Sequence, residues 1–288
     1  MRNKAWFTPR TLDELQKVLA EKKAADCFIC GGTDLLIACK NGKTVTGFID
    51  LTKLPLLREV VLGNDWVFIG SAVTYDEIFG NSYVRKYLPA LSKAAGQVGS
   101  QQIRNRGTLG GGVANASPAS DLIPVLTCLR AAVRVLNGAG QVQEISINEF
   151  ILGAGKVALA ADQCILGFKI PTAKNLHTVY VKLGSRSQVT IAQITATAAL
   201  YTENGKISSM DLVIGSIGPK PVSIREAVAE FSGKTIIFLD EKDILYCSAF
   251  FERYIKENVP EKFDRDYKAV AVRGVLFDLF EEIRKMAL

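Results

Sequence analysis

The chain has 288 residues, of which 48% are hydrophobic and 22% charged, with a formal net charge of +6. This composition is that of a globular protein able to bury a core without a metal or disulfide staple. No run of five or more Lys/Arg marks a nucleic-acid-binding arm, and no apolar stretch approaches the roughly 20 residues of a membrane span. The N-terminus has no apolar signal segment, so we expect a cytoplasmic protein.

The first 50 residues alternate between helical and strand patterns. Thr11 and Glu14 have capping-box spacing and precede a helical apolar stripe. Residues 26–29 and 47–51 predict short strands, with a helical turn at 35–39 between them. This alternation indicates a small α/β unit.

The middle of the chain mixes short strands and helices. A strand pair is expected at residues 56–62 and 66–69, followed by a helix from Thr74 and a largely helical stretch at 83–98 that Pro89 interrupts. A glycine-rich segment covers 99–119. After it we expect a helix at 121–129, a hairpin formed by 132–136 and 142–147, and a strand at 164–170.

From about residue 174 the strand patterns become longer. Three are predicted, at 179–183, 195–201 and 206–214, and Asn204-Gly205 is a hairpin signal between the last two. Helical periodicity returns at 224–231 and from 244 to the end. We therefore predict a domain boundary near 172–175, which gives a domain of residues 1–173 (subdomains about 1–54 and 55–173) and a C-terminal domain of residues 174–288.

Metal ligands are scarce. The six cysteines lie mostly in apolar runs, as buried free thiols do in a reducing compartment. Cys27 and Cys30 form a C-x-x-C, but without a second pair they are weak evidence for a metal or redox site. The one histidine, His177, falls in a predicted linker, where a surface or hinge position is expected. We predict no metal site.

A first glycine-rich loop, Cys30-Gly31-Gly32-Thr33-Asp34, follows a predicted strand and precedes a helical turn. Glycines let the backbone approach an anion closely, and N–H groups at such a turn can cradle phosphate. Thr33 adds a hydroxyl donor. The alternative is an ordinary strand-to-helix turn.

A second loop, Thr108-Leu109-Gly110-Gly111-Gly112, contains three adjacent glycines, which are costly to order. Its backbone could wrap phosphate oxygens, with Thr108 donating a hydrogen bond. The alternative is a flexible linker, but apolar residues on both sides favour a packed binding loop. Neither loop matches the P-loop or the Rossmann fingerprint, which disfavours both of those nucleotide folds.

Together these segments resemble the flavin subunits of molybdenum hydroxylases, such as those of xanthine, carbon monoxide and nicotinate dehydrogenases. Residues 28–35 resemble the first pyrophosphate loop of that family, residues 97–112 resemble the second, and Ala116-Ser117-Pro118-Ala119-Ser120-Asp121 follows as in the family. The resemblance covers essentially the whole chain. It implies an α+β fold of the vanillyl-alcohol oxidase / p-cresol methylhydroxylase type, with bound FAD.

The resemblance also implies roles for individual residues. The pyrophosphate would be held by Phe28, Ile29, Cys30, Gly31, Gly32, Thr33, Asp34 and Leu35 and by Thr108, Leu109, Gly110, Gly111 and Gly112, with Gly99 and Ser100 close by. Asp121 would accept a hydrogen bond from a cofactor hydroxyl, or alternatively serve as a helix N-cap partner. Ile165 would contact the flavin through its backbone. Lys182 would lie near the isoalloxazine and raise its potential, the alternative being a solvated strand residue.

Two positions differ from residues found in the family. Gly112 stands where the family usually has Asn, so a side-chain hydrogen bond to FAD is lost. Val98 stands where some relatives have an aromatic residue over the flavin, so flavin stacking is not expected there.

The resemblance implies an electron-transfer subunit with no catalytic residue of its own. A molybdopterin-binding large subunit would oxidise the substrate and an iron–sulfur small subunit with [2Fe-2S] clusters would relay electrons to this FAD. NAD is the usual acceptor among relatives. The scattered cysteines supply no cluster site on this chain. Two alternatives stay open: a self-contained FAD-dependent reductase of the MurB type, and a non-catalytic scaffold that has lost FAD.

Overall fold

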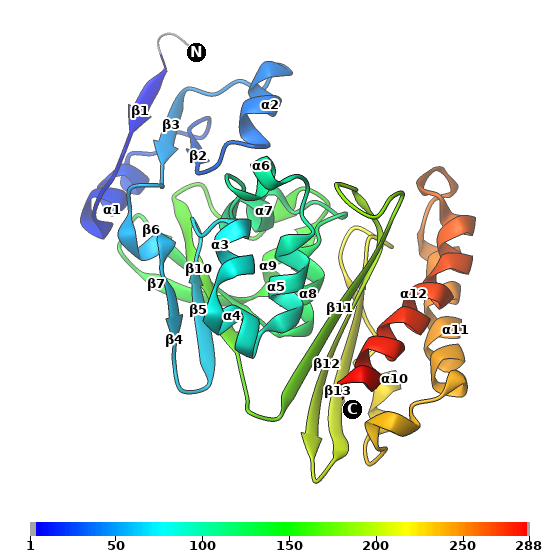
Figure 1. The fold of residues 1–288 in the computed structure, drawn as a ribbon. Coiled ribbons are helices and arrows are strands. Elements are labelled where there is room, and N and C mark those ends of the chain that lie inside the picture. Colours follow the sequence, from blue (N-terminus) through cyan, green and yellow to red (C-terminus); the bar gives the residue numbers. More distant parts are fainter. Residues whose placement is uncertain (1–3, 287–288) are drawn as a thin grey trace.

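A computed structural model describes residues 4–286, with Glu226, Ala227 and Phe238 described by their backbone alone (Figure 1). Within these residues no helix combines the length and the apolar character needed to cross a bilayer. The described residues form three larger sheets, which follow one another along the chain, and a small two-stranded sheet; helices pack between and beside the larger sheets.

The N-terminal sheet is parallel, with strand order β1-β3-β2. Thr11 caps its first helix, because its hydroxyl accepts from Glu14 N at 3.2 Å. The strands and helices expected from the sequence are present: α1 (Leu12–Ala20), β2 (Cys27–Ile29), α2 (Leu35–Lys40) and β3 (Gly47–Asp50). The sequence did not predict the edge strand β1 (Ala5–Phe7).

The middle sheet is antiparallel, with order β4-β5-β10-β6-β7. Its strands are β4 (Val60–Leu62), β5 (Trp66–Gly70), β6 (Ala132–Asn137), β7 (Val142–Ser146) and β10 (Gln163–Pro171). The prediction of a strand from residue 56 was wrong. Pro55 begins a 3-10 helix, η1 (Pro55–Arg58), because its fixed φ suits a first helical position.

Helices beside the middle sheet include α3 (Tyr75–Gly80), α4 (Ser82–Tyr87), α5 (Pro89–Gly96) and α8 (Leu122–Cys128). Pro89 separates α4 from α5 as expected. The glycine-rich segment is more ordered than a loop, since it contains α6 (Gln101–Arg104) and α7 (Leu109–Asn115). A short connection of α9 (Ile147–Phe150), β8 (Ile151–Gly153) and β9 (Lys156–Val157) leads into β10.

The C-terminal sheet is antiparallel, with order β11-β12-β13-β14: β11 (Leu176–Gly184), β12 (Ala192–Glu203), β13 (Lys206–Gly215) and β14 (Val222–Ser223). Asn204 and Gly205 have φ of 52° and 77°, as a type I′ hairpin requires. His177 is not in a linker as expected. It lies within β11 opposite Leu200, with Nε2 3.2 Å from Thr202 Oγ1.

Helices follow the C-terminal sheet to the end of the chain. They are α10 (Arg225–Val228), η2 (Ala229–Phe231), η3 (Ile236–Phe238), α11 (Glu241–Asn258), η4 (Glu261–Phe263) and α12 (Arg265–Lys285). Helix α12 covers one face of the sheet, while α5 and α8 cover the other (Figure 1). The C-terminal sheet is thus the middle layer between two sets of helices.

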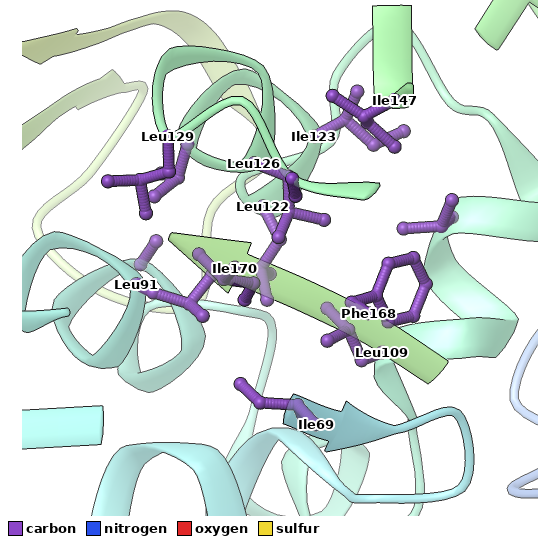
Figure 2. Packing of buried hydrophobic residues seen from close by; sticks show 14 of the residues in the cluster. Ile69, Leu91, Leu109, Leu122, Ile123, Leu126, Leu129, Ile147, Phe168 and Ile170 are labelled. Atoms are coloured by element: carbon purple, nitrogen blue, oxygen red, sulfur yellow. The ribbon is translucent and has the colours of Figure 1, made fainter. Parts of the chain in front are cut away.

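The core of the middle region fixes the start of α7. Phe168 and Ile170 of β10 pack with Leu122 and Leu126 of α8 and with Leu109 of α7 (Figure 2). All five are buried, and burial of one such side chain stabilises by about 1.5–3 kcal/mol. Leu109 therefore anchors the second glycine loop to the core.

Candidate functional site

The two glycine loops meet at one cavity of about 460 Å³. Their backbones touch, because a Cβ placed on Gly31 would lie 1.8 Å from the carbonyl oxygen of Arg106. The residues predicted from the sequence that line the cavity are Phe28, Ile29, Cys30, Gly31, Gly32, Thr33, Asp34, Leu35, Thr108, Gly110, Gly111, Gly112 and Ile165. Segments about 75 residues apart in the sequence are thus brought together.

The first loop presents free hydrogen-bond donors. The N–H groups of Gly31, Gly32, Thr33 and Asp34 have no partner among the residues that the structure describes. Gly32 has φ of 72°, the left-handed conformation that glycine adopts without strain. Consecutive N–H groups of this kind form a concave site for an anion.

The second loop uses its donors within the protein. Leu109 N donates to Val73 O at 3.0 Å and Gly110 N to Ser71 O at 2.9 Å. The hydroxyl and carbonyl of Thr108 accept from Gly111 N at 3.2 Å and Gly112 N at 2.9 Å, as the N-cap of α7. These amides are engaged within the protein in this structure, so their contact with phosphate oxygens stays a prediction.

Glycine is needed in the second loop for close packing. A Cβ on Gly110 would lie 2.5 Å from Ser71 Cβ, and one on Gly107 would lie 2.8 Å from the ring of Tyr75. A Cβ on Gly112 would lie 2.1 Å from the Tyr75 hydroxyl oxygen. Where the resemblance leads one to expect an asparagine side chain, the space is already taken by Tyr75.

Charge and thiols complete the cavity wall. Lys22 and Lys43 line it beside Asp26 and Asp34, so cations are available to an anionic ligand. Burial raises the pKa of the Cys30 thiol to about 11, which keeps it protonated at neutral pH. Within residues 4–286 no group of three or more His, Cys, Asp or Glu is placed to hold a metal.

The residues present fit a dinucleotide diphosphate. Free amides and two lysines suit its charge, and the glycines leave backbone close to the ligand. The hydroxyl oxygen of Ser71, another cavity residue, is buried without a partner among the described residues. Such orphaned polar groups are expected where a ligand completes the hydrogen bonding.

Asp121 and Lys182 form a second buried group. The Tyr180 hydroxyl donates to Asp121 Oδ1 at 2.7 Å, and Lys182 Nζ donates to Asp121 Oδ2 and to Gln97 O, both at 3.0 Å. Burial raises the pKa of Asp121, while Lys182 and Tyr180 act against that shift. Both carboxylate oxygens thus already have a donor.

This geometry rules out two alternatives. Asp121 occupies the N-cap position of α8, but its side chain makes no capping hydrogen bond, and Ile123 N donates to Ser120 Oγ at 3.2 Å instead. Lys182 is not solvated, because its side chain is only 4% exposed. Five predicted residues do not line the cavity, so their contact with a cofactor stays a prediction: Gly99, Ser100, Leu109, Asp121 and Lys182.

Comparisons with known proteins identify the family of the chain. A family model described as "FAD binding domain in molybdopterin dehydrogenase" matches residues 2–173. The chain is 29% identical to the nicotinate dehydrogenase FAD-subunit of Eubacterium barkeri, over 98% of this chain and 97% of that one. It is 30% identical to the xanthine dehydrogenase FAD-binding subunit of Escherichia coli O157:H7, over 75% of each.

Solved structures confirm the predicted α+β FAD-binding fold. A chain of the cyanide-inactivated Cu,Mo-CO dehydrogenase superposes with a TM-score of 0.88, covering 98% of each chain at 20% identity. A chain of quinoline 2-oxidoreductase from Pseudomonas putida 86 gives 0.87 at 22% identity, covering 99% of this chain and 98% of that one. At such identities the likeness concerns the fold.

Proposed function

Since this chain belongs to the family of FAD-binding domains in molybdopterin dehydrogenases, we propose that it carries electrons from an iron–sulfur subunit, through FAD, to NAD. It is the FAD-binding subunit of an oxidoreductase of the molybdenum hydroxylase family. The finer proposal adds the direction of electron flow, the acceptor, and two partners: a molybdopterin-binding large subunit and a [2Fe-2S] small subunit.

The observation that carries the proposal is the shared cavity of the two glycine loops. FAD, when bound, supplies the redox chemistry by accepting and donating electrons. The residues of this chain bind and orient: amides 31–34 and the cavity lysines would hold the diphosphate, and Ile165, which lines the cavity, would contact the flavin through its backbone. We propose no catalytic side chain.

The buried Asp121–Lys182 pair would act at the flavin end. Its ammonium group is fixed by two acceptors and is shielded from water, and the Asp121 carboxylate 3.0 Å away offsets part of its charge. We propose that Lys182 raises the flavin potential and that Asp121 orients Lys182. The six free cysteines support a reducing compartment, and a cytoplasmic location is part of the proposal.

Purification of the native complex tests the proposal. We expect this chain to co-purify with a larger and a smaller partner, with molybdenum, iron and FAD in the same fractions. After the complex is reduced with dithionite, added NAD should reoxidise the flavin and yield NADH.

Other outcomes identify the alternatives. A chain that purifies alone with FAD and catalyses a reduction by itself would be a self-contained reductase of the MurB type. A colourless chain that does not take up FAD would be a scaffold. Reoxidation by oxygen, ferredoxin or a quinone but not NAD would contradict only the acceptor.

A further inference from the structure

Tyr75 lines the cavity, and its hydroxyl has no role in the proposed function. Its side chain comes from the first turn of α3 and is 9% exposed. It lines the same cavity as the free amides of the first loop. Among the described residues no hydrogen-bond partner of this hydroxyl is present, and the oxygen is not sealed from solvent as Ser71 Oγ is.

The position of the Tyr75 ring is fixed by the second glycine loop. Tyr75 N donates to Gly107 O at 3.0 Å, and Thr74 just before it forms a complete capping box with Glu77. The ring occupies the space that side chains at 107 and 112 would need, with approaches of 2.8 and 2.1 Å to their virtual Cβ atoms. The hydroxyl is therefore held at one place on the cavity wall.

The hydroxyl can act only as a donor toward an anionic ligand. Burial, with the charges of Asp34 and Asp121, raises the pKa of Tyr75, so the phenol stays protonated. A ligand oxygen can take the place of water at this hydroxyl and accept its hydrogen bond.

We propose that Tyr75 is a FAD-binding residue whose hydroxyl donates to an acceptor oxygen of the bound dinucleotide, and that Gly112 is a glycine in order to leave room for it. The inference rests on FAD binding at this cavity. It assigns to a side chain of α3 the contact that the engaged amides of the second loop do not make.

Tyr75→Phe in the full chain tests whether the Tyr75 hydroxyl donates a hydrogen bond to FAD. FAD removed from the purified protein is titrated back, and its Kd is measured from flavin fluorescence. We expect the Kd to rise about tenfold, the effect of one buried hydrogen bond, with little change in the thermal unfolding of the FAD-free protein. Tyr83→Phe, which removes a hydroxyl from a side chain that is 44% exposed, is the matched control and should bind FAD like the wild type.

Gly112→Ala tests whether residue 112 must be glycine to leave room for the Tyr75 hydroxyl. The new methyl group displaces the Tyr75 hydroxyl, so the Kd for FAD should rise at least tenfold, again by loss of that bond. In the double variant Tyr75→Phe/Gly112→Ala the methyl meets only ring carbon at 3.3 Å. The stability of the FAD-free double variant should then exceed that of Gly112→Ala, with the Kd left at the Tyr75→Phe value.

Unchanged FAD affinity in Tyr75→Phe, with wild-type protein that binds FAD, would overturn the inference and leave the proposed function intact. Wild-type protein that takes up no FAD would overturn both. If Tyr75→Phe does not fold, Gly112→Ala decides: unchanged FAD affinity there overturns the inference, and a Kd for FAD that rises at least tenfold supports it.

Discussion

The first glycine loop, residues 30–34, and the second, residues 107–112, lie against the same cavity but use glycine differently. In the first loop four consecutive N–H groups stay free. In the second loop the N–H groups of 109–112 are all engaged, and its glycines accommodate Ser71 and Tyr75 instead. One loop offers donors to a ligand, and the other lets neighbouring elements pack at van der Waals distance.

This difference shows that two loops lining one binding site can have separate roles: one supplies hydrogen-bond donors to the ligand, and the other supports the fold around it. Apart from Gly112, which borders the Tyr75 hydroxyl, changes in the second loop should act mainly through the fold, whereas polar changes in the first should act mainly on the ligand. Four experiments test that division, beginning with the position where the two loops touch.

The largest effect is expected for Gly31→Ala. Its methyl group would need the space of the Arg106 carbonyl, and neither backbone can move alone. We expect a loss of about 3 kcal/mol of unfolding free energy, at the upper end of overpacking effects, together with loss of bound FAD. Denaturant unfolding and flavin content measure both. Gly80→Ala, where nothing lies within 4 Å, is the control and should be neutral or slightly stabilising.

Lys182→Met is expected to come next, because it leaves the buried Asp121 with Tyr180 as its one remaining donor. We expect about 2 kcal/mol of destabilisation at neutral pH, less than for a fully stranded charge because Asp121 can take up a proton. The pKa of folded Asp121 already lies above its usual 3.8, so its folded form favours the proton and stability falls as pH rises through that pKa.

Lys182→Met raises this pKa further. Its deficit relative to the wild type should therefore be small below pH 4 and grow as pH rises. Unfolding free energies measured from pH 4 to 8 show this, and Lys182→Met/Asp121→Asn should remove the pH dependence. A deficit that is constant across this range would contradict the assignment to Asp121.

A smaller, paired effect distinguishes the two loops directly. Thr108→Val removes the N-cap of α7 and should cost about 1 kcal/mol of stability with FAD affinity little changed. Thr33→Val should leave stability unchanged, because its hydroxyl reaches only Asp34 at 3.4 Å, and should raise the Kd for FAD several-fold, about the value of one hydrogen bond. Equal effects of both variants on FAD affinity would contradict the claim that the first loop binds the ligand while the second loop stabilises the fold.

The smallest effect concerns the thiol of Cys30. Since burial raises its pKa to about 11, its alkylation by iodoacetamide should be slow at pH 8 and rise about tenfold per pH unit toward pH 10. Bound FAD should slow it further, because Cys30 lines the cavity. Peptide mass spectrometry follows the reaction, with Cys30→Ser as the blank. Rapid labelling at pH 7 would place Cys30 outside the cavity.

The sequence by itself determined most of the elements and the identity of the two loops. Period-2 and helical patterns depend on neighbours a few residues apart, so β10, α8 and the long C-terminal strands were predicted to within a few residues. The glycine-rich loops and the Ser-Pro-Ala-Ser-Asp segment were enough to indicate an FAD-binding protein, which the family match confirms.

Tertiary structure decided what each loop residue does. Whether an amide is free depends on partners such as Val73 and Ser71, which lie more than 30 residues from the second loop. The placement of Tyr75 against Gly112 and the burial of Lys182 on Asp121 are likewise contacts between distant segments. Local sequence carries no record of such contacts, because hydrogen bonding and packing are settled only when the chain brings those segments together.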